Sequence, residues 1–309
     1  MDLSIVIPIF NEEKNLPILY DRLSAVCQKL RVSYELIFVN DGSSDGSLEK
    51  IRLLSNTDQA VDFIDFSRNF GHQLAVTAGL DHAEGDAVVI IDGDLQDPPE
   101  FIEDLYRKWQ EGYEVVYAKR KKRKGEKRLK RYTAAIFYRI LSSITSINIP
   151  IDTGDFRIID RKVVEALKQM PEHNKFIRGQ IAWIGFNQVA LEYERDERHS
   201  GTTGYTIKKM FSFAMDGITA FSNFPLRLVT FAGFVVSLVA FILILYALYS
   251  KFILKDFVQG WTSIMLSILF LGGIQLISIG IIGEYISRIN NNARNRPLYI
   301  IRESKKNKK

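Results

Sequence analysis

Hydrophobic residues along the first 120 positions alternate between short unbroken runs and helix-like spacing. The runs are rich in β-branched residues and apolar nearly throughout, which is typical of parallel strands buried on both faces. They are Leu3–Phe10, Glu35–Asn40, Val61–Phe66, Ala87–Ile91 and Glu114–Ala118. Stretches with helical periodicity lie between them, at Leu16–Leu30, Leu48–Ser55, His72–His82 and Phe101–Gln110. This alternation predicts repeated βαβ units, and therefore an α/β domain with an open, mostly parallel sheet.

Two long apolar stretches near the C-terminus differ from this pattern. Leu228–Ser250 contains 23 residues without a charge, and Phe257–Gly283 contains another 27. As helices rising ~1.5 Å per residue they would be roughly 35 and 40 Å long, enough to cross a hydrocarbon core of about 30 Å. Their position in the chain excludes a signal peptide. We therefore predict a transmembrane helical hairpin.

Basic residues flank the predicted hairpin unevenly. Lys and Arg cluster before the first stretch and after the second, whereas the connection has only Lys251 and Lys255, with Asp256 beside them. Because Lys and Arg favour the cytoplasmic side, we predict a multi-pass protein of the cell membrane with both termini in the cytoplasm. The expected organisation is a cytoplasmic α/β domain over 1–200, an amphipathic juxtamembrane helix region over 201–226, the hairpin over 227–286 and a basic tail over 287–309.

Composition excludes several classes of protein. Of the 309 residues, 25% are charged and 12% are aromatic, which argues against a disordered or fibrous chain. Cys27 is the one cysteine, so the chain has no internal disulfide and no thiolate zinc site. Its apolar neighbours predict a position in the core.

The formal net charge of +5 includes a strongly basic run, Lys119–Arg131, in which ten of thirteen residues are Lys or Arg. Such a run can be a solvated loop. It can also contact a phosphate acceptor or membrane lipids, at about 1 kcal/mol per basic residue near anionic headgroups. No aromatic-laced RNA motif accompanies the run, so nucleic acid is not an expected partner.

Polar residues follow four of the predicted strands. Asn11 and Glu12 come after the first, Asp41 after the second, 67–69 after the third and Asp92 after the fourth. In open α/β sheets, ligands bind in the crevice outside the carboxyl ends of the strands. The pattern therefore predicts that these side chains line one ligand site.

The most informative short motif is Asp92-Gly93-Asp94-Leu95-Gln96-Asp97-Pro98-Pro99. Two carboxylates and an amide at alternate positions offer oxygen ligands to a hard cation, and Mg²⁺ is usually bound by one or two carboxylates plus substrate phosphates. Turns also produce Asp-x-Asp by chance, so the motif gains weight from its place at a strand end. No Walker A motif is present, and no dinucleotide-binding glycine motif follows the first strand.

Taken together, four segments and the hairpin resemble a known family. The segments are Pro8–Glu13, Asn40–Asp45, Ser67–Gln73 and Asp92–Pro99. In combination they resemble a family 2 glycosyltransferase with a GT-A fold. More narrowly, the chain is similar to the polyprenyl-phosphate glycosyltransferases, which include bactoprenol glucosyltransferases and dolichol-phosphate mannose synthases. The resemblance covers essentially the whole chain, and the Arg-Asn-Phe-Gly-His-Gln segment favours the bactoprenol-type branch.

The resemblance implies a nucleotide-sugar site at matching positions. Pro8, Asn11, Glu12 and Asp41 would line the nucleotide pocket, with Asp41 contacting the base. Asp92 would lie beside the ribose and the diphosphate of the donor.

The resemblance also implies a metal, a lid and a residue near the reacting centre. Asp94 and Gln96 would hold Mg²⁺ or Mn²⁺, and Arg198 lies in a segment similar to the loop that closes over the diphosphate. The segment Ile151–Arg157 resembles the acceptor side of the family and would place Asp155 near the reacting atoms.

The implied reaction is inverting transfer of one sugar to undecaprenyl phosphate, giving a lipid-linked sugar for modification of cell-envelope glycans. UDP-glucose is the first candidate donor; mannose, GlcNAc and an aminoarabinose derivative are the alternatives. A polyprenyl phosphate is already an anion at pH 7, so its oxygen can attack with little help from a base. Arg120, Lys130 or Arg131 could hold that phosphate by charge-assisted hydrogen bonds.

Several alternatives stay open from the sequence. A non-catalytic membrane protein could use the basic run to bind lipids or a partner. Asp155 could merely cap a turn, His72 and His82 are expected to be structural, and His199 could belong to the proposed lid. The hairpin could also form homo-oligomers through its glycines, at Gly272, Gly273, Gly280 and Gly283.

Overall fold

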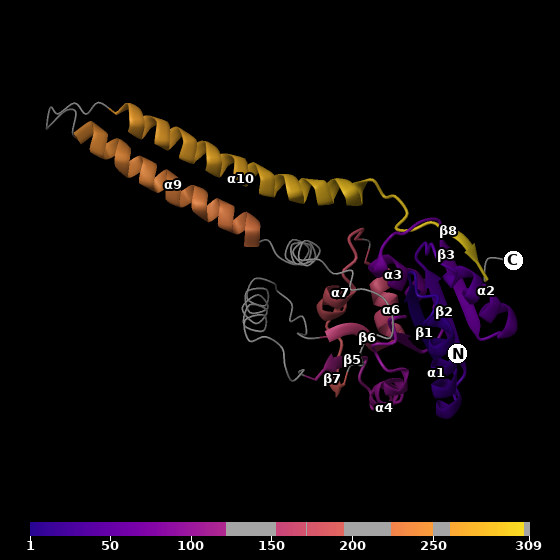
Figure 1. Cartoon of the computed structure of the whole chain (residues 1–309). Helices are drawn as coiled ribbons and strands as arrows, with labels where there is room; N and C mark the ends of the chain where they lie inside the picture. Colours follow the sequence, from indigo (N-terminus) through magenta and orange to yellow (C-terminus); the bar gives the residue numbers. More distant parts are fainter. Residues whose placement is uncertain (122–152, 171, 195–223, 250–259, 306–309) are drawn as a thin grey trace. The chain divides into compact units, whose positions relative to one another are not determined.

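The computed structural model describes residues 1–121, 153–170, 172–194, 224–249 and 260–305 (Figure 1). Contacts divide the chain into two units. The first contains residues 1–142, 147–210 and 296–309, and the second contains residues 143–146 and 211–295.

The first unit is built on a mixed β-sheet, which has eight strands within the described residues. Along the sheet their order is β7-β5-β6-β4-β1-β2-β3-β8. The strands are β1 (Leu3–Ile9), β2 (Tyr34–Asn40), β3 (Val61–Phe66), β4 (Ala87–Ile90), β5 (Val115–Arg120), β6 (Thr153–Asp160), β7 (Gln188–Tyr193) and β8 (Ile301–Ser304).

Strands β4, β1, β2 and β3 form a parallel core, with Ile9 of β1 opposite Asn40 of β2. Strand β6 is antiparallel to both β4 and β5, β7 is parallel to β5, and β8 is antiparallel to β3. All seven residues of β1 are buried, as its unbroken apolar run predicts for a central strand. The expected α/β fold with a mostly parallel sheet is confirmed.

Helices cover both faces of this sheet and give three layers. Helices α1 (Leu16–Leu30), α2 (Ser47–Thr57) and α4 (Ile102–Gln110) pack in one hydrophobic cluster with Leu3, Ile5 and Ile7. On the other face, α3 (His72–His82), α6 (Arg161–Lys168) and α7 (Ile177–Ile184) pack with Val6, Ile37 and Ile64. A short 3₁₀ turn, Pro99–Phe101, precedes α4.

The close packing of α3 on β1 depends on Gly79. A Cβ at this position would lie 2.1 Å from Cγ1 of Val6, so a side chain here would push the helix off the sheet. Because α3 begins at His72, this packing fixes where His72 lies relative to the strands.

The second unit contains two long apolar helices, α9 (Phe224–Tyr249) and α10 (Trp261–Ala293). Their 26 and 33 residues correspond to roughly 39 and 50 Å of helix. Pro225–Leu243 and Phe270–Ala293 are apolar enough to cross a membrane, with mean hydropathies of 2.3 and 1.4, and neither window is buried. Two helices of the expected kind are therefore present, and α10 continues beyond residue 286, where the hairpin was expected to end.

The chain after α10 contains an element that the sequence analysis did not anticipate. Where only a basic tail was expected, β8 joins the sheet of the first unit at the edge formed by β3 (Figure 1). The expected juxtamembrane helix region and most of the basic run lie outside the described residues.

Candidate active site

The four parallel strands β1 to β4 bring their carboxyl ends to one edge of the sheet, which we call the carboxyl edge. The polar segments that follow these strands are in contact with one another, as the next paragraphs show. Strand β6 lies beside β4 and runs antiparallel to it, so β6 begins at this edge. Asp155 is near its start. The expected convergence of strand-end side chains is therefore present.

Asn11 and Glu12 join the end of β1 to the segment that leads into α2. Asn11 has a left-handed backbone, with φ of 57°, and its Oδ1 accepts a hydrogen bond from the Ser44 N–H at 2.8 Å. The N–H of Glu12 donates to Oγ of Ser47 at 3.0 Å, and its Oε2 accepts from Nδ2 of Asn15. Asn adopts this left-handed conformation more readily than most residues. The hydrogen bonds to Ser44 and Ser47 hold the turn in place.

Asp41 connects the end of β2 to the loop that follows β3. Its carboxylate accepts hydrogen bonds from the N–H groups of Phe70, at 2.7 Å, and Gly71, at 3.0 Å. Burial raises the pKa of Asp41, against the lowering effect of these two N–H groups. The neighbouring Gly42 has φ of 68°, and a Cβ there would lie 2.5 Å from the Asn69 nitrogen, so the two loops touch backbone to backbone.

The acidic motif after β4 forms a tight turn. Leu95 has φ of 60°, which is uncommon for a bulky residue and costs of order 1–3 kcal/mol. The turn is held by a hydrogen bond from the Gln96 N–H to Oδ1 of Asp94, at 3.1 Å, and by the hydroxyl of Tyr193, which donates to the buried Asp97. Strained backbone that is held in this way is typical of functional sites.

Asp155 lies at the centre of a polar cluster. Its Oδ1 accepts a hydrogen bond from Nε of Arg178 at 2.6 Å, and its Oδ2 accepts from Nε2 of His72 at 2.9 Å and Nε2 of Gln73 at 3.2 Å. The side chain of Asp155 is only 8% exposed. A buried carboxylate is tolerated when it is paired with a cation and hydrogen-bonded, and this one has both kinds of partner.

The charges in this cluster shift three pKa values. Burial would raise the pKa of Asp155, but Arg178 and His72 hold it well below its usual range. Burial lowers the pKa of His72, yet the hydrogen bond to Asp155 and the charges of Asp92 and Asp155 raise it to about 9. Burial and the neighbouring carboxylates raise the pKa of Asp92 to about 6, against the effect of His72. At pH 7, Asp155 is therefore ionised and His72 is protonated.

Asp92 has an oxygen that is suited to an additional partner. Its Oδ1 is buried and makes no hydrogen bond within the described residues, and it lies 3.6 Å from Nε2 of His72. Asp94, Asp97 and Asp155 are close enough to raise its pKa. A buried oxygen that lacks a hydrogen bond and lies among several carboxylates fits a divalent cation, because Mg²⁺ takes oxygen ligands.

The protein by itself would supply only part of the coordination of such a cation. Within the described residues, no three His, Cys, Asp or Glu side chains converge as a metal cage. A site with one or two protein carboxylates that is completed by substrate phosphates fits this arrangement.

Arg120 lies at the end of β5, beside the start of β6. Its Nη2 is 2.9 Å from where a Cβ of Gly154 would be, and its Nε is buried without a hydrogen bond in the described structure. Successive residues of a strand face opposite sides of the sheet, so Arg120 and Asp155 lie on different faces of β6. The glycine therefore makes room for the guanidinium on the face of β6 opposite the Asp155 side chain.

Comparison with known proteins identifies the family. The profile of "Glycosyl transferase family 2" matches residues 4–168, and that of "GtrB C-terminal hairpin" matches residues 224–289. The chain belongs to glycosyl transferase family 2. It is a glycosyltransferase with a GT-A fold, and the hairpin match together with α9 and α10 indicates association with a membrane.

Similar proteins span nearly the same length as this glycosyltransferase. An "Uncharacterized glycosyltransferase YkcC" of Bacillus subtilis is 52% identical over 97% of this chain and 93% of its own. A "Prophage bactoprenol glucosyl transferase homolog" of Escherichia coli is 45% identical over 99% and 100% of the two chains. A "Bactoprenol glucosyl transferase" of Shigella phage SfII is 43% identical over 98% of each.

Among solved structures, S. aureus TarS 1-349 in complex with UDP-GlcNAc is similar to this one. It has a TM-score of 0.48 and 16% sequence identity, and the match covers 71% of this chain and 66% of that chain. This similarity is too low to say anything about substrate.

The structure of this glycosyltransferase brings together most of the predicted site residues that it describes. Asp92 and Asp155 both contact His72 at the carboxyl edge, Asp94 and Gln96 lie in the turn that follows Asp92, and Asn11, Glu12 and Asp41 lie on the adjoining turns. Pro8 is buried in β1 opposite Val39, and its carbonyl oxygen lies against Gly93. Lys130, Arg131, Arg198 and His199 lie outside the described residues.

Three polar partners of Asp155 were not assigned a functional role from the sequence. His72 was expected to be structural, but it contacts both Asp155 and Asp92. The sequence offered a signal for a role of His72, because His72 and Gln73 are the last residues of the Ser67–Gln73 segment that carries the family resemblance. Arg178 had no such signal, since it is 23 residues from Asp155 and follows no recognisable motif. His82, by contrast, is in keeping with a structural role, because Nδ1 donates to the Ala78 carbonyl within α3.

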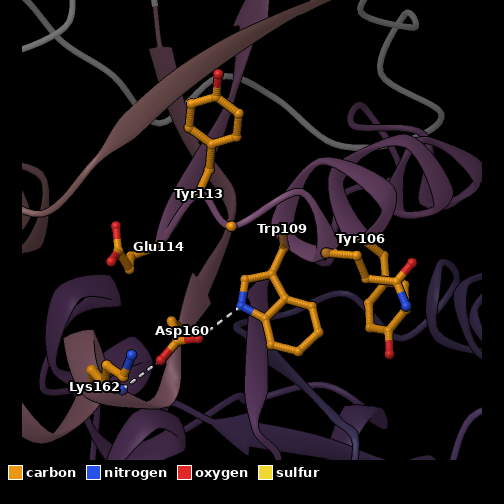
Figure 2. Close-up of a pocket in the computed structure, with 8 residues that line it drawn as sticks. Tyr106, Trp109, Tyr113, Glu114, Asp160 and Lys162 are labelled. Carbon is orange, nitrogen blue, oxygen red and sulfur yellow. Dashed lines mark hydrogen bonds between the residues drawn. The ribbon is translucent and has the colours of Figure 1, made fainter.

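A hollow of about 530 Å³ lies at the opposite edge of the sheet, and Figure 2 shows residues that line it. It is lined by Tyr106, Trp109, Tyr113, Glu114 and other residues, next to Asp160 where β6 ends. Trp109 and the N–H of Lys162 both donate to the Asp160 carboxylate, so this polar group is already satisfied. The hollow does not contain the features that distinguish the carboxyl edge.

Proposed function

We propose that this glycosyltransferase transfers a single glucose from UDP-glucose to undecaprenyl phosphate, with inversion at the anomeric carbon. The product would serve the modification of cell-envelope glycans. The structural observation that carries the proposal is that His72 contacts both Asp155 and Asp92, so the turn that carries Asp94 and Gln96 meets the Asp155 cluster at the carboxyl edge. The lipid acceptor and the glucose are supported by near full-length relatives that are named bactoprenol glucosyl transferases.

The donor is expected to bind at the carboxyl edge. Asp94 and Gln96 would hold Mg²⁺ or Mn²⁺, which supplies positive charge to the leaving diphosphate. The orphaned Oδ1 of Asp92 supports a cation or a ribose hydroxyl at this position. Pro8, Asn11 and Glu12 would line the nucleotide pocket.

Asp41 would contact the base through lone pairs that Phe70 and Gly71 leave unused, since each carboxylate oxygen accepts more than one hydrogen bond. Arg198 would close over the diphosphate.

In the transfer step, an oxygen of the acceptor phosphate attacks the anomeric carbon as the bond to the nucleoside diphosphate breaks. The bonding electrons leave with the diphosphate. No proton has to be removed from the acceptor, which fits an Asp155 whose low pKa makes it a poor base.

Asp155 instead holds the cationic groups of Arg178 and His72 at the carboxyl edge. There they would offset the repulsion between the two anionic substrates. Arg120, Lys130 and Arg131 are the proposed ligands of the acceptor phosphate, and Arg120 is already next to β6.

The membrane arrangement supports a lipid acceptor. We place the catalytic unit and both termini on the cytoplasmic side, from the excess of Lys and Arg outside the hairpin. Helices α9 and α10 would span the bilayer and keep the active site close to the acceptor phosphate. Self-association through the glycines of α10 stays a prediction.

The deciding experiment follows radiolabelled sugar from a panel of nucleotide sugars into undecaprenyl phosphate, in detergent, with and without EDTA. We expect a lipid-extractable product from UDP-glucose that EDTA abolishes and that added Mg²⁺ or Mn²⁺ restores. Product from a mannose, GlcNAc or aminoarabinose donor alone would replace glucose in the proposal. Failure of every donor with folded protein would contradict the lipid acceptor and favour a non-catalytic membrane protein.

A further inference from the structure

The short strand β8 ends at the loop that carries part of the active site. It runs antiparallel to β3 at the edge of the sheet (Figure 1), and the N–H of Ser67 donates to the carbonyl of Ile300 at 2.9 Å. Ser67 is the first residue after β3. The segment that follows α10 therefore contacts the start of the 67–71 loop.

Arg302 of β8 contacts two groups at the end of β3. Its Nη2 donates to the carbonyl oxygen of Ser67 at 2.6 Å, and its Nη1 lies 3.7 Å from Oδ2 of Asp65. Asp65 is fully buried; Oδ1 accepts from Nδ2 of Asn40 at 2.7 Å, while Oδ2 makes no hydrogen bond in the described structure. A buried carboxylate is costly without a compensating charge, and Arg302 supplies one.

Tyr299, which precedes β8, also contacts the end of β3. Its ring stacks on Phe66, with centroids 5.0 Å apart, and its hydroxyl donates to Oδ2 of Asp81 on α3 at 2.8 Å. Phe66 in turn packs edge-on against Phe70 inside the loop. Contacts from the C-terminal segment thus reach β3, the 67–71 loop and α3.

These contacts lead directly to the active site. Phe70 and Gly71 donate to Asp41, and the next residue is His72, which contacts Asp155 and Asp92. Asn40, the partner of Asp65, immediately precedes Asp41. A displacement at Ser67 or Asp65 would therefore move both the proposed nucleotide contact and the imidazolium beside the reacting centre.

We propose that Arg302 is a positioning residue for glycosyl transfer, which holds the 67–71 loop through Ser67 and Asp65 so that His72 faces Asp155 and Asp92. The proposal rests on the roles proposed above for Asp41 and His72. On this proposal, the segment after the hairpin contributes to catalysis by positioning the 67–71 loop, and it is more than a basic tail.

The neighbouring residue provides a matched control. Glu303 pairs with Arg52 of α2 at 2.5 Å, so it fastens the same strand to the sheet's helical layer without touching the 67–71 loop. The side chains of Glu303 and Arg302 are both partly exposed to solvent. Glu303→Gln weakens the attachment of β8, whereas Arg302→Ala removes the contacts to Ser67 and Asp65 specifically.

The test compares Arg302→Ala, Arg302→Lys and Glu303→Gln in full-length protein, by steady-state transfer and by hydrogen exchange of the peptide covering residues 67–74. We expect Arg302→Ala to lower kcat about tenfold or more, since small misplacements of a reacting group are costly. Exchange at 67–74 should rise in the same variant. Arg302→Lys should recover most of both properties, because it restores a cation and a donor, and Glu303→Gln should resemble the parent.

Unchanged kcat and unchanged exchange in Arg302→Ala would overturn the proposal. So would an equal loss in Glu303→Gln, because the effect would then be the attachment of β8 as a whole. If Arg302→Ala does not fold, Asp65→Asn is compared with Asp65→Asn/Arg302→Ala, because both variants lack the buried charge of Asp65. We expect the double variant to have a lower kcat and faster exchange at 67–74 than Asp65→Asn. Equal kcat and equal exchange in the two variants would overturn the proposal. The exchange measurement needs no substrate, so it decides the inference even if the proposed acceptor or donor fails.

Discussion

The two edges of the sheet carry similar residue types in very different states. At the carboxyl edge, Asp92 has a buried oxygen that makes no hydrogen bond within the described residues, and desolvation and the neighbouring carboxylates raise its pKa to about 6. At the opposite edge, Asp160 accepts from Trp109 at 3.0 Å and from the N–H of Lys162 at 2.9 Å, and it caps helix α6. One carboxylate retains the capacity to accept further hydrogen bonds or a cation, and the other completes the fold.

Backbone conformation does not separate the edges as cleanly, because Arg31 at the end of α1, on the opposite edge, also has a left-handed backbone, with φ of 56°. The turns at the carboxyl edge place two residues other than glycine, Asn11 and Leu95, in the left-handed region. At the opposite edge the one positive φ among the residues that line the hollow belongs to Gly112, which adopts it without strain. Within the described residues, the buried oxygen of Asp92 that lacks a hydrogen bond, rather than a left-handed backbone or a hollow, therefore distinguishes the carboxyl edge.

The largest expected effect comes from the metal-binding motif. Asp94→Asn should reduce sugar transfer by about a hundredfold or more, because the charge on the leaving diphosphate would no longer be stabilised. Initial rates at matched amounts of folded protein measure this, with EDTA-treated parent enzyme as a second comparison. Full activity in Asp94→Asn would refute the metal assignment.

Breaking the Asp155 cluster should cost somewhat less. Arg178→Gln removes the cation that is 2.6 Å from Asp155, so the pKa of Asp155 should rise toward its usual range and transfer should fall about tenfold or more. Binding of UDP, measured by calorimetry, should change little, since Arg178 donates to Asp155 and to the carbonyl of Thr153, which belong to β6 and not to the β1 and β2 turns. Loss of UDP binding equal to the loss of rate would place Arg178 in the donor pocket instead.

At the opposite edge, a substitution should affect stability alone. Asp160→Ala removes the N-cap of α6 and the acceptor for Trp109, which should lower the free energy of unfolding by about 1–2 kcal/mol. Chemical denaturation measures this loss. The kcat of the folded variant should equal that of the parent; a fall in kcat comparable with that of Arg178→Gln would erase the distinction between the two edges.

The smallest effect concerns a residue at neither edge. Burial raises the pKa of Cys27 to about 12, so its thiol stays protonated at pH 8.5, where an ordinary cysteine is about half ionised. Alkylation by iodoacetamide at this pH should be slow in the native protein and fast after unfolding in denaturant. Rapid modification of the native protein would show that α1 opens readily.

Local patterns in the sequence determined much of the fold. The strand Val61–Phe66 and the helices Leu16–Leu30 and His72–His82 agree with the structure residue for residue. Apolar runs and helical periodicity are properties of neighbouring residues, so they can be recognised without knowing the rest of the chain. The position of Asp92 and Asp94 at a strand end follows from the same local pattern.

Only the tertiary structure decided which distant groups meet. Arg178 is 23 residues from Asp155, and Arg302 is 235 residues from Ser67, yet each pair is joined by a short hydrogen bond. Strand β8 has four residues, too few for a periodic signal, and it exists because the edge of β3 has backbone groups that need partners. Such pairings depend on how strands and helices pack across the whole sheet, which no local pattern encodes. The sequence determined the five strands of the first 120 residues, the acidic motif and the two long apolar helices. The packing decided that His72 and Arg178 meet at Asp155 and that Arg302 meets Ser67.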